Sequence, residues 1–346
     1  MNTPLRRIEV GDFSPTIKLP SQTGGKVWAF DTSLAGRPVA YIIFRNASST
    51  ATVATLEAFK NCFAEFQEIG ARVVGISNLF PVENGQLAQN LDLPFSFLSD
   101  VNGDYAASYG LPPGDDAIAC AVLDRNCRLL KLLSGSPGTA MATQALKICG
   151  KESTASEGKQ VKTQAPVLLI PRVFEPDFCK QLIKFWRQGD KAEDQITQRA
   201  EDGQSDKVSD VVKRRTDVLV PEGDHPVNLE IRRRLSMRVI PELEKAFDHH
   251  ASRYELARIG CYESAKKGFF RAHRDLYHGD TVTPRRFAMS LNLNDEFEGG
   301  DVRFAEYGMQ TYRAPLGGGL VFSCRLLHEV TPVTKGKRFT LLLFFN

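Results

Sequence analysis

Short apolar runs and one helical stripe dominate the first part of the chain. Three runs have the length and continuity expected of buried strands: residues 39–44, 71–77 and 118–123. Between the first two, residues 54–69 carry an apolar side chain on each helical turn, and Gly70 is placed to end that helix. The polar residues 124–127 predict a hairpin turn after the third run. This order predicts an α/β domain with a sheet covered by helices.

The pattern changes after residue 150. Residues 151–165 are polar without an apolar period, which predicts a linker. A second domain then opens with an apolar strand and an amphipathic helix that begins at Pro176. A longer helix is expected over residues 226–252, interrupted at Pro241, with a strand at 256–262 after it. We therefore predict a first domain at 1–150, a linker at 151–165 and a second domain at 166–346.

The last strand of the chain has two chemically different faces. Phe339, Leu341 and Leu343 lie on one face, and Arg338 and Thr340 lie on the other. An arginine that points into the interior of a sheet needs an anion, because a buried unpaired charge is costly. The guanidinium fork fits a carboxylate, and the Thr340 hydroxyl is placed to donate a further hydrogen bond to it.

Two potential metal ligands lie upstream of this strand. His273 and Asp275 are two residues apart, so in an extended strand they project to the same side. His328 follows the apolar run 320–323, which we expect to return antiparallel to the strand of His273. Two imidazoles and one carboxylate leave coordination positions open, an arrangement that suits non-haem Fe(II) and its co-substrates.

Composition narrows the class of protein. The 346 residues carry a formal net charge of +3, which is small for this length and favours neither a nucleic-acid binder nor a membrane-surface protein. No apolar run approaches the length of a membrane-spanning helix. The chain has seven cysteines, an odd number, and they lack the spacing of a zinc site. Both features are typical of reduced thiols in a cytoplasmic protein. A cytoplasmic protein is therefore expected.

The second half of the chain resembles the prolyl 4-hydroxylase-like branch of the 2-oxoglutarate and Fe(II)-dependent oxygenases. The resemblance is carried by residues 286–294 and 297–304 together with five single positions: Tyr262, His273, Asp275, His328 and Arg338. It implies a double-stranded β-helix (jelly roll) with flanking helices, and Fe(II), 2-oxoglutarate and O₂ as cofactor and co-substrates. It also implies that Tyr262 hydrogen-bonds the 2-oxoglutarate, and Asn292 falls where related hydroxylases often carry another tyrosine for the same carboxylate.

Residues 10–148 resemble the peroxiredoxin branch of the thioredoxin-like fold. The resemblance is carried by residues 11–15, 70–77, 98–100 and 109–111 and by the strand that ends at Phe44. In this frame the family's proline falls on Arg45 and its peroxidatic cysteine on Thr52. A threonine cannot replace a low-pKa thiolate as the nucleophile toward peroxide, and Cys62 fits a small buried thiol better than a substitute for it. We expect a non-catalytic domain used for binding, homodimerisation or support.

The function expected from these features is a 2-oxoglutarate-dependent hydroxylase that acts on a prolyl residue or a small molecule and releases succinate and CO₂. Two alternatives stay open: a metal- and 2-oxoglutarate-binding sensor without turnover, and a thiol peroxidase acting through the first domain. The substrate, whether a protein or a small molecule, is not readable, and neither a nucleic-acid nor a membrane partner is expected. Residues 187–225 are a candidate lid, and His278 is a competing metal ligand.

Overall fold

The chain forms two compact units, Met1–Gly158 and Lys159–Asn346. The computed structural model describes residues 7–15, 18–28, 36–111, 117–152, 163–193, 196–199, 205–208, 212–275 and 285–346. The division falls inside the stretch predicted as a linker, most of which lies outside the described residues. Among the described helices, none combines the length and the apolar character needed to cross a bilayer.

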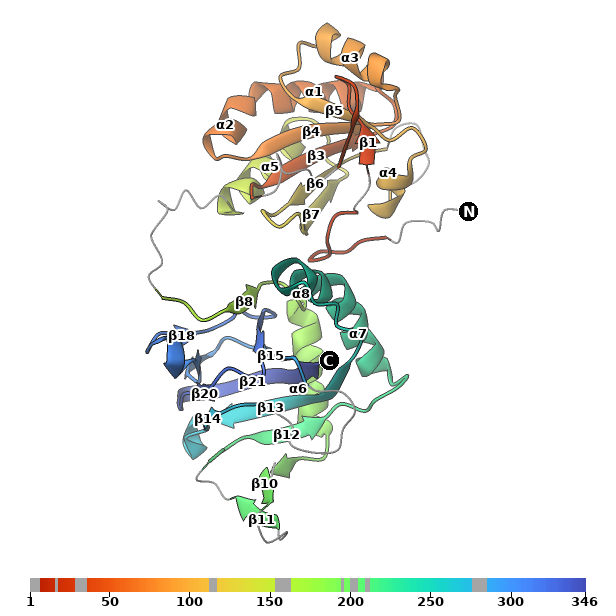
Figure 1. Cartoon of the computed structure of the whole chain (residues 1–346). Coiled ribbons are helices and arrows are strands. Elements are labelled where there is room, and N and C mark those ends of the chain that lie inside the picture. Colours follow the sequence, from red (N-terminus) through yellow and green to blue (C-terminus); the bar gives the residue numbers. More distant parts are fainter. Residues whose placement is uncertain are drawn as a thin grey trace. The chain divides into compact units, whose positions relative to one another are not determined.

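The first unit is built on a five-stranded sheet with the strand order β5-β4-β3-β6-β7 (Figure 1). β3, β4 and β5 are parallel, whereas β6 is antiparallel to β3 and β7 to β6. A separate hairpin joins β1 and β2. The strands are β1 (Lys18–Pro20), β2 (Lys26–Trp28), β3 (Val39–Phe44), β4 (Arg72–Ser77), β5 (Ser96–Ser99), β6 (Ile118–Leu123) and β7 (Leu129–Ser134). The helices are α1 (Thr50–Asn61), α2 (Phe63–Glu68), α3 (Pro81–Asn90), α4 (Asp104–Ser108) and α5 (Thr139–Glu152).

Both faces of this sheet are buried, which explains why its strands read as continuous apolar runs. Tyr41 and Ile43 pack in one cluster with residues of α4, and Ala40, Ile42 and Phe44 pack in another with residues of α1, α2 and α5. Side chains alternate along a strand, so each strand supplies both clusters. The predicted α/β arrangement is therefore present in this unit.

The second unit contains two antiparallel sheets. The large sheet has the order β8-β19-β15-β21-β13-β12-β9, with β16 also paired to β21, and the small sheet has the order β14-β20-β17-β18. The strands are β8 (Val167–Ile170), β9 (Ala192–Glu193), β10 (Ile196–Arg199), β11 (Ser205–Val208), β12 (Thr216–Leu219), β13 (Tyr254–Glu263), β14 (Phe270–His273), β15 (Phe287–Asn292), β16 (Phe297–Gly299), β17 (Val302–Arg303), β18 (Thr311–Tyr312), β19 (Gly319–Ser323), β20 (His328–Val330) and β21 (Val333–Phe345). β10 and β11 form a separate hairpin.

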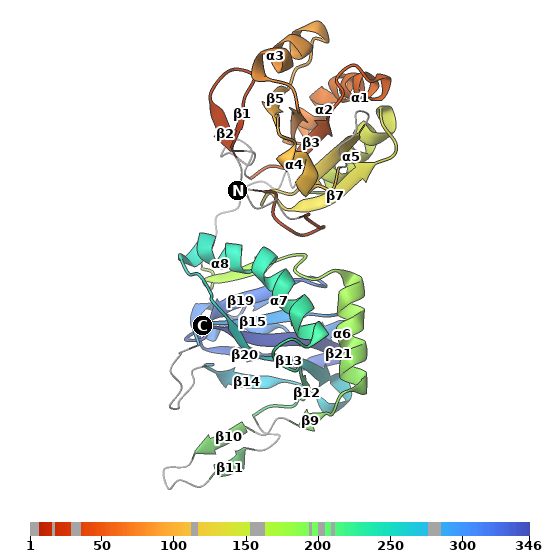
Figure 2. The same cartoon turned by 90° about the vertical axis from the view of Figure 1, so that its right-hand side faces the viewer.

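Helices cover one face of the large sheet. They are α6 (Pro176–Gln188), α7 (Pro226–Arg238) and α8 (Ile240–Phe247), and short 3₁₀ turns occur at Ser264–Lys266 and Ala305–Tyr307. In Figures 1 and 2 these helices lie against the large sheet. Phe339, Leu341 and Leu343 of β21 belong to the apolar core that includes residues of these helices. The two faces predicted for the last strand are thus confirmed, and Arg338 and Thr340 lie on the face away from the helices.

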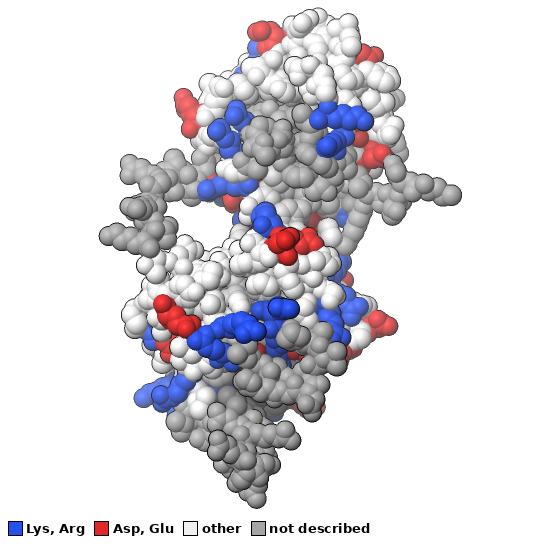
Figure 3. All heavy atoms as spheres, in the orientation of Figure 1, with Lys and Arg blue, Asp and Glu red and all other residues white. Residues whose placement is uncertain are grey.

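The opposite face of the large sheet packs in part against the small sheet. Ala288, Leu320 and Phe322 of the large sheet share an apolar cluster with Val302 and Tyr312 of the small one. Lys and Arg atoms outnumber Asp and Glu atoms on the face of this unit that Figure 3 shows. Ion pairs in this unit include Arg303 with Glu329 and Arg313 with Asp301.

Three predicted elements differ from the structure. The helix expected at 54–69 begins at Thr50 and is broken at Cys62, so that Phe59 and Phe66 stack with ring centroids 5.6 Å apart. The helix expected to reach 252 ends at Phe247, because Asp248 adopts a left-handed conformation with φ of 50°. The two histidines of 249–250 therefore lie beyond the helix. The run 320–323 pairs with β15 and β8 rather than with the strand of His273.

Candidate metal centre

His273, Asp275 and His328 come together on the small sheet. His273 ends β14 and His328 begins β20, and the two residues are direct partners in the antiparallel pairing of these strands. His273 Nε2 lies 3.4 Å from Asp275 Oδ1, and His328 Nε2 lies 3.3 Å from Asp275 Oδ2. All three ligand atoms lie within 4.8 Å of one another. Asp275 follows the end of β14 and is not part of the strand, although it reaches the same point.

Backbone hydrogen bonds orient both imidazoles toward Asp275. His273 Nδ1 lies 2.7 Å from the Arg271 carbonyl oxygen, and His328 Nδ1 lies 3.0 Å from the Leu326 carbonyl oxygen. A carbonyl oxygen only accepts, so each Nδ1 carries the proton and each Nε2 presents its lone pair to the centre. Two lone pairs and a carboxylate facing one another fit a cation, and this donor set suits Fe(II).

Burial and mutual contact also shape the protonation of the centre. Burial lowers the pKa of His273, which favours the neutral imidazole that binds metals. Burial raises the pKa of Asp275, but His273 and His328 lower it further, and the net pKa lies well below its usual value. The carboxyl group is therefore ionised at neutral pH.

Phe270 links the histidines to the face of the large sheet. Its ring stacks on His273, with the ring centroids 3.5 Å apart. The same ring packs in an apolar cluster with Tyr262, Val330 and Val333. Tyr262 lies opposite Arg338 in the pairing of β13 with β21. The four side chains of His273, Phe270, Tyr262 and Arg338 thus connect the metal ligands to the predicted carboxylate site.

Arg338 is buried, and its hydrogen-bond partners are neutral side chains. Its side chain donates from Nε to Asn292 Oδ1 at 2.9 Å and from Nη2 to Ser290 Oγ at 2.8 Å. Nη1 is buried and has no hydrogen-bond partner within the described residues. Burial lowers the pKa of Arg338 to about 10. A buried cation with an unused donor fits an anion, and a carboxylate matches its fork geometry.

Neighbouring polar side chains hold Arg338 in place. Asn292 donates from Nδ2 to the Ala314 carbonyl oxygen at 2.7 Å, which turns its Oδ1 toward Arg338. The Thr340 hydroxyl donates to the Leu291 carbonyl oxygen at 2.9 Å and lies 3.1 Å from Ser290 Oγ. The predicted site residues Asn292, Thr340, Tyr262 and Arg338 therefore lie side by side on β15, β21 and β13.

Sequence reasoning missed three polar residues of this face: Ser290, Arg215 and Asp217. Ser290 could have been found from strand alternation, because it lies two residues before Asn292 on the same strand face. Arg215 donates from Nη1 to Tyr262 Oη at 3.1 Å and is paired with Asp217. Their place beside Tyr262 depends on the register of β12 against β13, which no local pattern specified.

Comparisons with known families agree with this geometry. Residues 257–346 match a model of the 2OG-Fe(II) oxygenase superfamily, and residues 10–128 match a model of the AhpC/TSA family. The chain carries an AhpC/TSA domain and a 2OG-Fe(II) oxygenase domain. The predicted resemblance of each half is thus confirmed, and the AhpC/TSA domain has a peroxiredoxin-like thioredoxin fold.

Individual relatives match one domain each. A chloroplastic peroxiredoxin Q of Populus jackii is 27% identical over 111 residues, which cover 32% of this chain and 51% of the relative. A PKHD-type hydroxylase of Burkholderia ambifaria is 41% identical over 49 residues, which cover 14% of this chain and 22% of that protein. A Pseudomonas putida prolyl-4-hydroxylase structure, 17% identical with a TM-score of 0.39, covers 53% of this chain and 93% of its own. The chain spans about half or less of the length of these curated relatives.

The AhpC/TSA domain lacks a nucleophile at the position that the resemblance assigns to the peroxidatic cysteine. Thr52 stands there and is buried in the first turn of α1. Cys62 is half-buried between α1 and α2, and its Sγ lies 3.2 Å from the Ala58 carbonyl oxygen. Burial and Glu65 raise the pKa of the Cys62 thiol, which disfavours the reactive thiolate.

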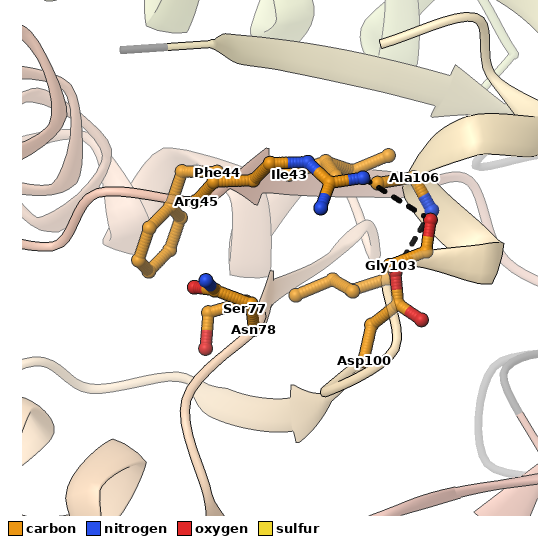
Figure 4. Close-up of a pocket in the computed structure, with 9 residues that line it drawn as sticks. Ile43, Phe44, Arg45, Ser77, Asn78, Asp100, Gly103 and Ala106 are labelled. Carbon is orange, nitrogen blue, oxygen red and sulfur yellow. Dashed lines mark hydrogen bonds between the residues drawn. The ribbon is translucent and has the colours of Figure 1, made fainter. Parts of the chain in front are cut away.

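A small pocket lies at the carboxyl ends of β3 and β4 in the AhpC/TSA domain. It has about 150 Å³ of empty space, part of it open to solvent. Figure 4 shows Arg45 extending across it toward Gly103, to whose carbonyl oxygen Nη2 donates at 3.2 Å. Asp100 lies on the other side and accepts from the backbone N–H groups of Tyr105 and Ala106. Arg45 thus occupies the space beside these strand ends.

Two sequence predictions near the oxygenase site fall outside the described residues. His278, the competing ligand, belongs to the segment 276–284. The candidate lid at 187–225 is described only in part, with 194–195, 200–204 and 209–211 outside the description.

Proposed function

We propose that the oxygenase domain is an Fe(II)- and 2-oxoglutarate-dependent dioxygenase that hydroxylates a prolyl residue or a small molecule and releases succinate and CO₂. One observation carries the proposal: a converging His-Asp-His donor set shares its domain with a buried arginine whose Nη1 has no partner in the described part of the chain. The family of the domain supports the same chemistry. A metal site alone does not require an organic anion. The buried Arg338 does, and this supports a carboxylate co-substrate.

His273, Asp275 and His328 would hold the ferrous ion. Together with 2-oxoglutarate and O₂, the bound ion would supply the oxidising equivalents that convert a C–H bond into C–OH. The backbone bonds at both Nδ1 atoms fix the rings, so that their lone pairs stay directed at the metal position. Phe270 covers one face of His273 and limits the access of water to it.

Arg338 would pair with the carboxylate of 2-oxoglutarate that is remote from the metal. Asn292 and Ser290 each occupy one nitrogen of the guanidinium, which leaves Nη1 available to the ligand. The phenol of Tyr262 would donate to the same carboxylate. The Thr340 hydroxyl already donates to a backbone carbonyl, so we assign it the task of holding Ser290.

Several finer features belong to this proposal. The two sheets of the oxygenase domain would form the double-stranded β-helix expected from the sequence. The substrate would be a protein or a small molecule, and homodimerisation through the AhpC/TSA domain stays a prediction. A cytoplasmic location also stays a prediction, in agreement with the free state of all seven cysteines.

The proposal is tested by succinate formation from 2-oxoglutarate with Fe(II) and O₂, against a panel of prolyl peptides, amino acids and cell extract. We expect His273→Ala and Asp275→Ala to lower turnover at least about a hundredfold, because loss of a ligand empties the metal site. Binding of Mn(II) to the chain, measured by calorimetry without O₂, provides a readout that does not depend on turnover.

His250→Ala is the matched control, because this imidazole is exposed and lies outside the triad. The control should keep both Mn(II) binding and succinate formation. Undiminished turnover in the triad variants would contradict the proposal. Tight binding of 2-oxoglutarate without succinate from any member of the panel would instead favour the sensor.

A further inference from the structure

Arg215 and Asp217 form a buried ion pair at the start of β12. Arg215 Nε lies 2.6 Å from Asp217 Oδ1 and Nη2 lies 2.7 Å from Oδ2, so the contact is bidentate. The two side chains are only 6% and 3% exposed. Unlike Arg338, Arg215 therefore has its charge balanced within the protein, and it does not need an external anion.

The strand register places this pair in line with the predicted carboxylate site. Asp217 lies opposite Gly260 in the pairing of β12 with β13. Gly260 lies opposite Thr340, and Tyr262 lies opposite Arg338, in the pairing of β13 with β21. Side chains two residues apart share a strand face. The ion pair consequently reaches Tyr262 from the side opposite to Arg338.

Tyr262 lies between two guanidinium groups. Arg215 Cζ and Arg338 Cζ are each 5.6 Å from the centroid of its ring. Arg215 Nη1 donates to the phenol oxygen at 3.1 Å, which occupies a lone pair and leaves the phenol proton for another acceptor. Within the described residues, Tyr262 donates this proton to no acceptor. An accepted hydrogen bond from a fixed cation also restricts where the proton can point.

We infer that Arg215 and Asp217 are positioning residues, which direct the Tyr262 proton to the carboxylate held by Arg338. The inference rests on the proposed function of the oxygenase domain. It adds that two residues which do not touch 2-oxoglutarate help to determine its affinity. Asp217 fixes the guanidinium of Arg215, the guanidinium fixes the phenol oxygen, and the phenol and Arg338 together bind the ligand.

Gly260 provides the space that the pair needs. A Cβ atom at this position would lie 2.7 Å from Arg215 Cδ and 2.8 Å from Asp217 Oδ1. Both distances are shorter than a van der Waals contact, so the pair must move if residue 260 is alanine. Gly260→Ala therefore displaces Arg215 without removing any polar group, which makes it an independent probe of the same geometry.

The experiment is a double-mutant cycle on 2-oxoglutarate affinity, measured by calorimetry with the Mn(II)-loaded full chain in the absence of O₂. Arg215→Met/Asp217→Asn removes both charges together, because removing Asp217 alone would leave the buried Arg215 without this carboxylate. We expect this variant and Tyr262→Phe each to raise the Kd about tenfold. The variant that combines all three substitutions should bind no more weakly than either parent.

Steady-state succinate formation gives a second readout. If the pair orients the co-substrate site, Arg215→Met/Asp217→Asn should raise the KM for 2-oxoglutarate with little change in kcat, and Gly260→Ala should do the same. Arg285→Met/Glu255→Gln removes a less buried ion pair at the other end of β13, with side chains 12% and 33% exposed, and serves as the control. It should leave both the Kd and the KM unchanged.

Each other outcome has a distinct meaning. Wild-type affinity in Arg215→Met/Asp217→Asn, or effects that multiply when combined with Tyr262→Phe, would overturn the inference and leave the proposed function in place. Equal weakening in the Arg285→Met/Glu255→Gln control would also overturn it, because the pair would then act only through strand stability. A wild-type chain that binds Mn(II) but no 2-oxoglutarate would overturn the proposed function itself.

Discussion

Arg45 of the AhpC/TSA domain, just after β3, and Arg338 of the oxygenase domain, within β21, differ in the groups that surround their guanidinium. Each has one buried nitrogen without a hydrogen-bond partner in the described part of the chain. Arg45 is half-buried, donates to the Gly103 carbonyl oxygen and interacts electrostatically with the Asp100 carboxyl group. Arg338 is fully buried among hydroxyl and amide groups, and the carboxyl group with which it interacts electrostatically, Asp301, is already paired with Arg313.

The difference shows why a buried arginine by itself does not define a binding site. A guanidinium that the protein already neutralises costs little to keep and has little affinity left for a ligand. A guanidinium kept without a counter-charge costs stability, and that cost is recovered only when an anion binds. By this criterion, Arg338 is a better candidate than Arg45 for binding an acidic ligand.

The largest effect expected from this comparison is on 2-oxoglutarate affinity. Arg338→Met should raise the Kd about thirtyfold or more, because it removes a buried charge-assisted contact worth about 2–5 kcal/mol. Arg45→Met should leave the Kd unchanged. Calorimetry on the Mn(II)-loaded chain measures both. Equal losses in the two variants would show that the comparison of their surroundings is mistaken.

Stability provides a second measurement on the same variants. Because Arg338 is buried without a directly bonded carboxylate in the absence of ligand, Arg338→Met should unfold at a urea concentration no lower than the wild type. Added 2-oxoglutarate should then stabilise the wild type but not Arg338→Met. Lower stability of Arg338→Met without ligand would mean that the guanidinium is balanced by a group that Arg338 does not contact in the structure.

The strands of both domains were readable from sequence to different degrees. β3 and β6 were predicted at their observed bounds, since strands buried on both faces give uninterrupted apolar runs. The alternation after Arg338 likewise predicted which residues of β21 face the helices. The predicted pairing of residues 320–323 with the strand of His273 was wrong. An apolar pattern specifies the face and the length of a strand but not its neighbouring strand. That register is set by packing among many residues distant in sequence.

The site followed the same division. Four site residues could be found from the sequence: His273, Asp275, His328 and Arg338. Metal-binding side chains and an arginine are uncommon on inward-facing positions of predicted strands, so they were noticeable. Arg215 and Asp217 sit in a charged stretch that reads as solvated surface, and only the pairing of β12 with β13 turns them inward. Long-range register therefore separates the residues that sequence could find from those it could not.

A smaller effect on stability is expected at Glu175. This carboxylate pairs directly with the buried Arg234, whereas Arg338 has no directly bonded carboxylate. Glu175 Oε2 lies 2.6 Å from Arg234 Nε. Burial raises the pKa of Glu175, but Arg234 and Arg238 lower it further, and the net pKa is below its usual value. Glu175→Gln should destabilise the oxygenase domain by about 2 kcal/mol at neutral pH. Urea unfolding followed by Trp186 fluorescence in a Trp28→Phe background measures it.

The sign of the pH dependence follows from the lowered pKa. A carboxylate with a folded pKa below its unfolded value stabilises the fold above the unfolded value, and that contribution disappears as pH falls through the folded pKa. The gap between wild type and Glu175→Gln should therefore narrow in acid. Glu230→Gln is the matched control, because Glu230 contacts the same Arg234 from a half-exposed position and should cost at most about 0.5 kcal/mol. A gap that widens in acid would contradict the assignment.

The smallest expected effect concerns Cys62 and tests whether the AhpC/TSA domain has kept any thiol chemistry. A peroxidatic thiol needs a lowered pKa and access to peroxide, whereas burial and Glu65 raise the pKa of Cys62 and its Sγ contacts the Ala58 carbonyl oxygen. Cys62→Ser should thus leave peroxide consumption in the presence of dithiothreitol at the level of the wild type. If Cys62→Ser abolished a measurable peroxide turnover, the domain would be a peroxidase after all, and catalysis would no longer be expected from the oxygenase domain alone.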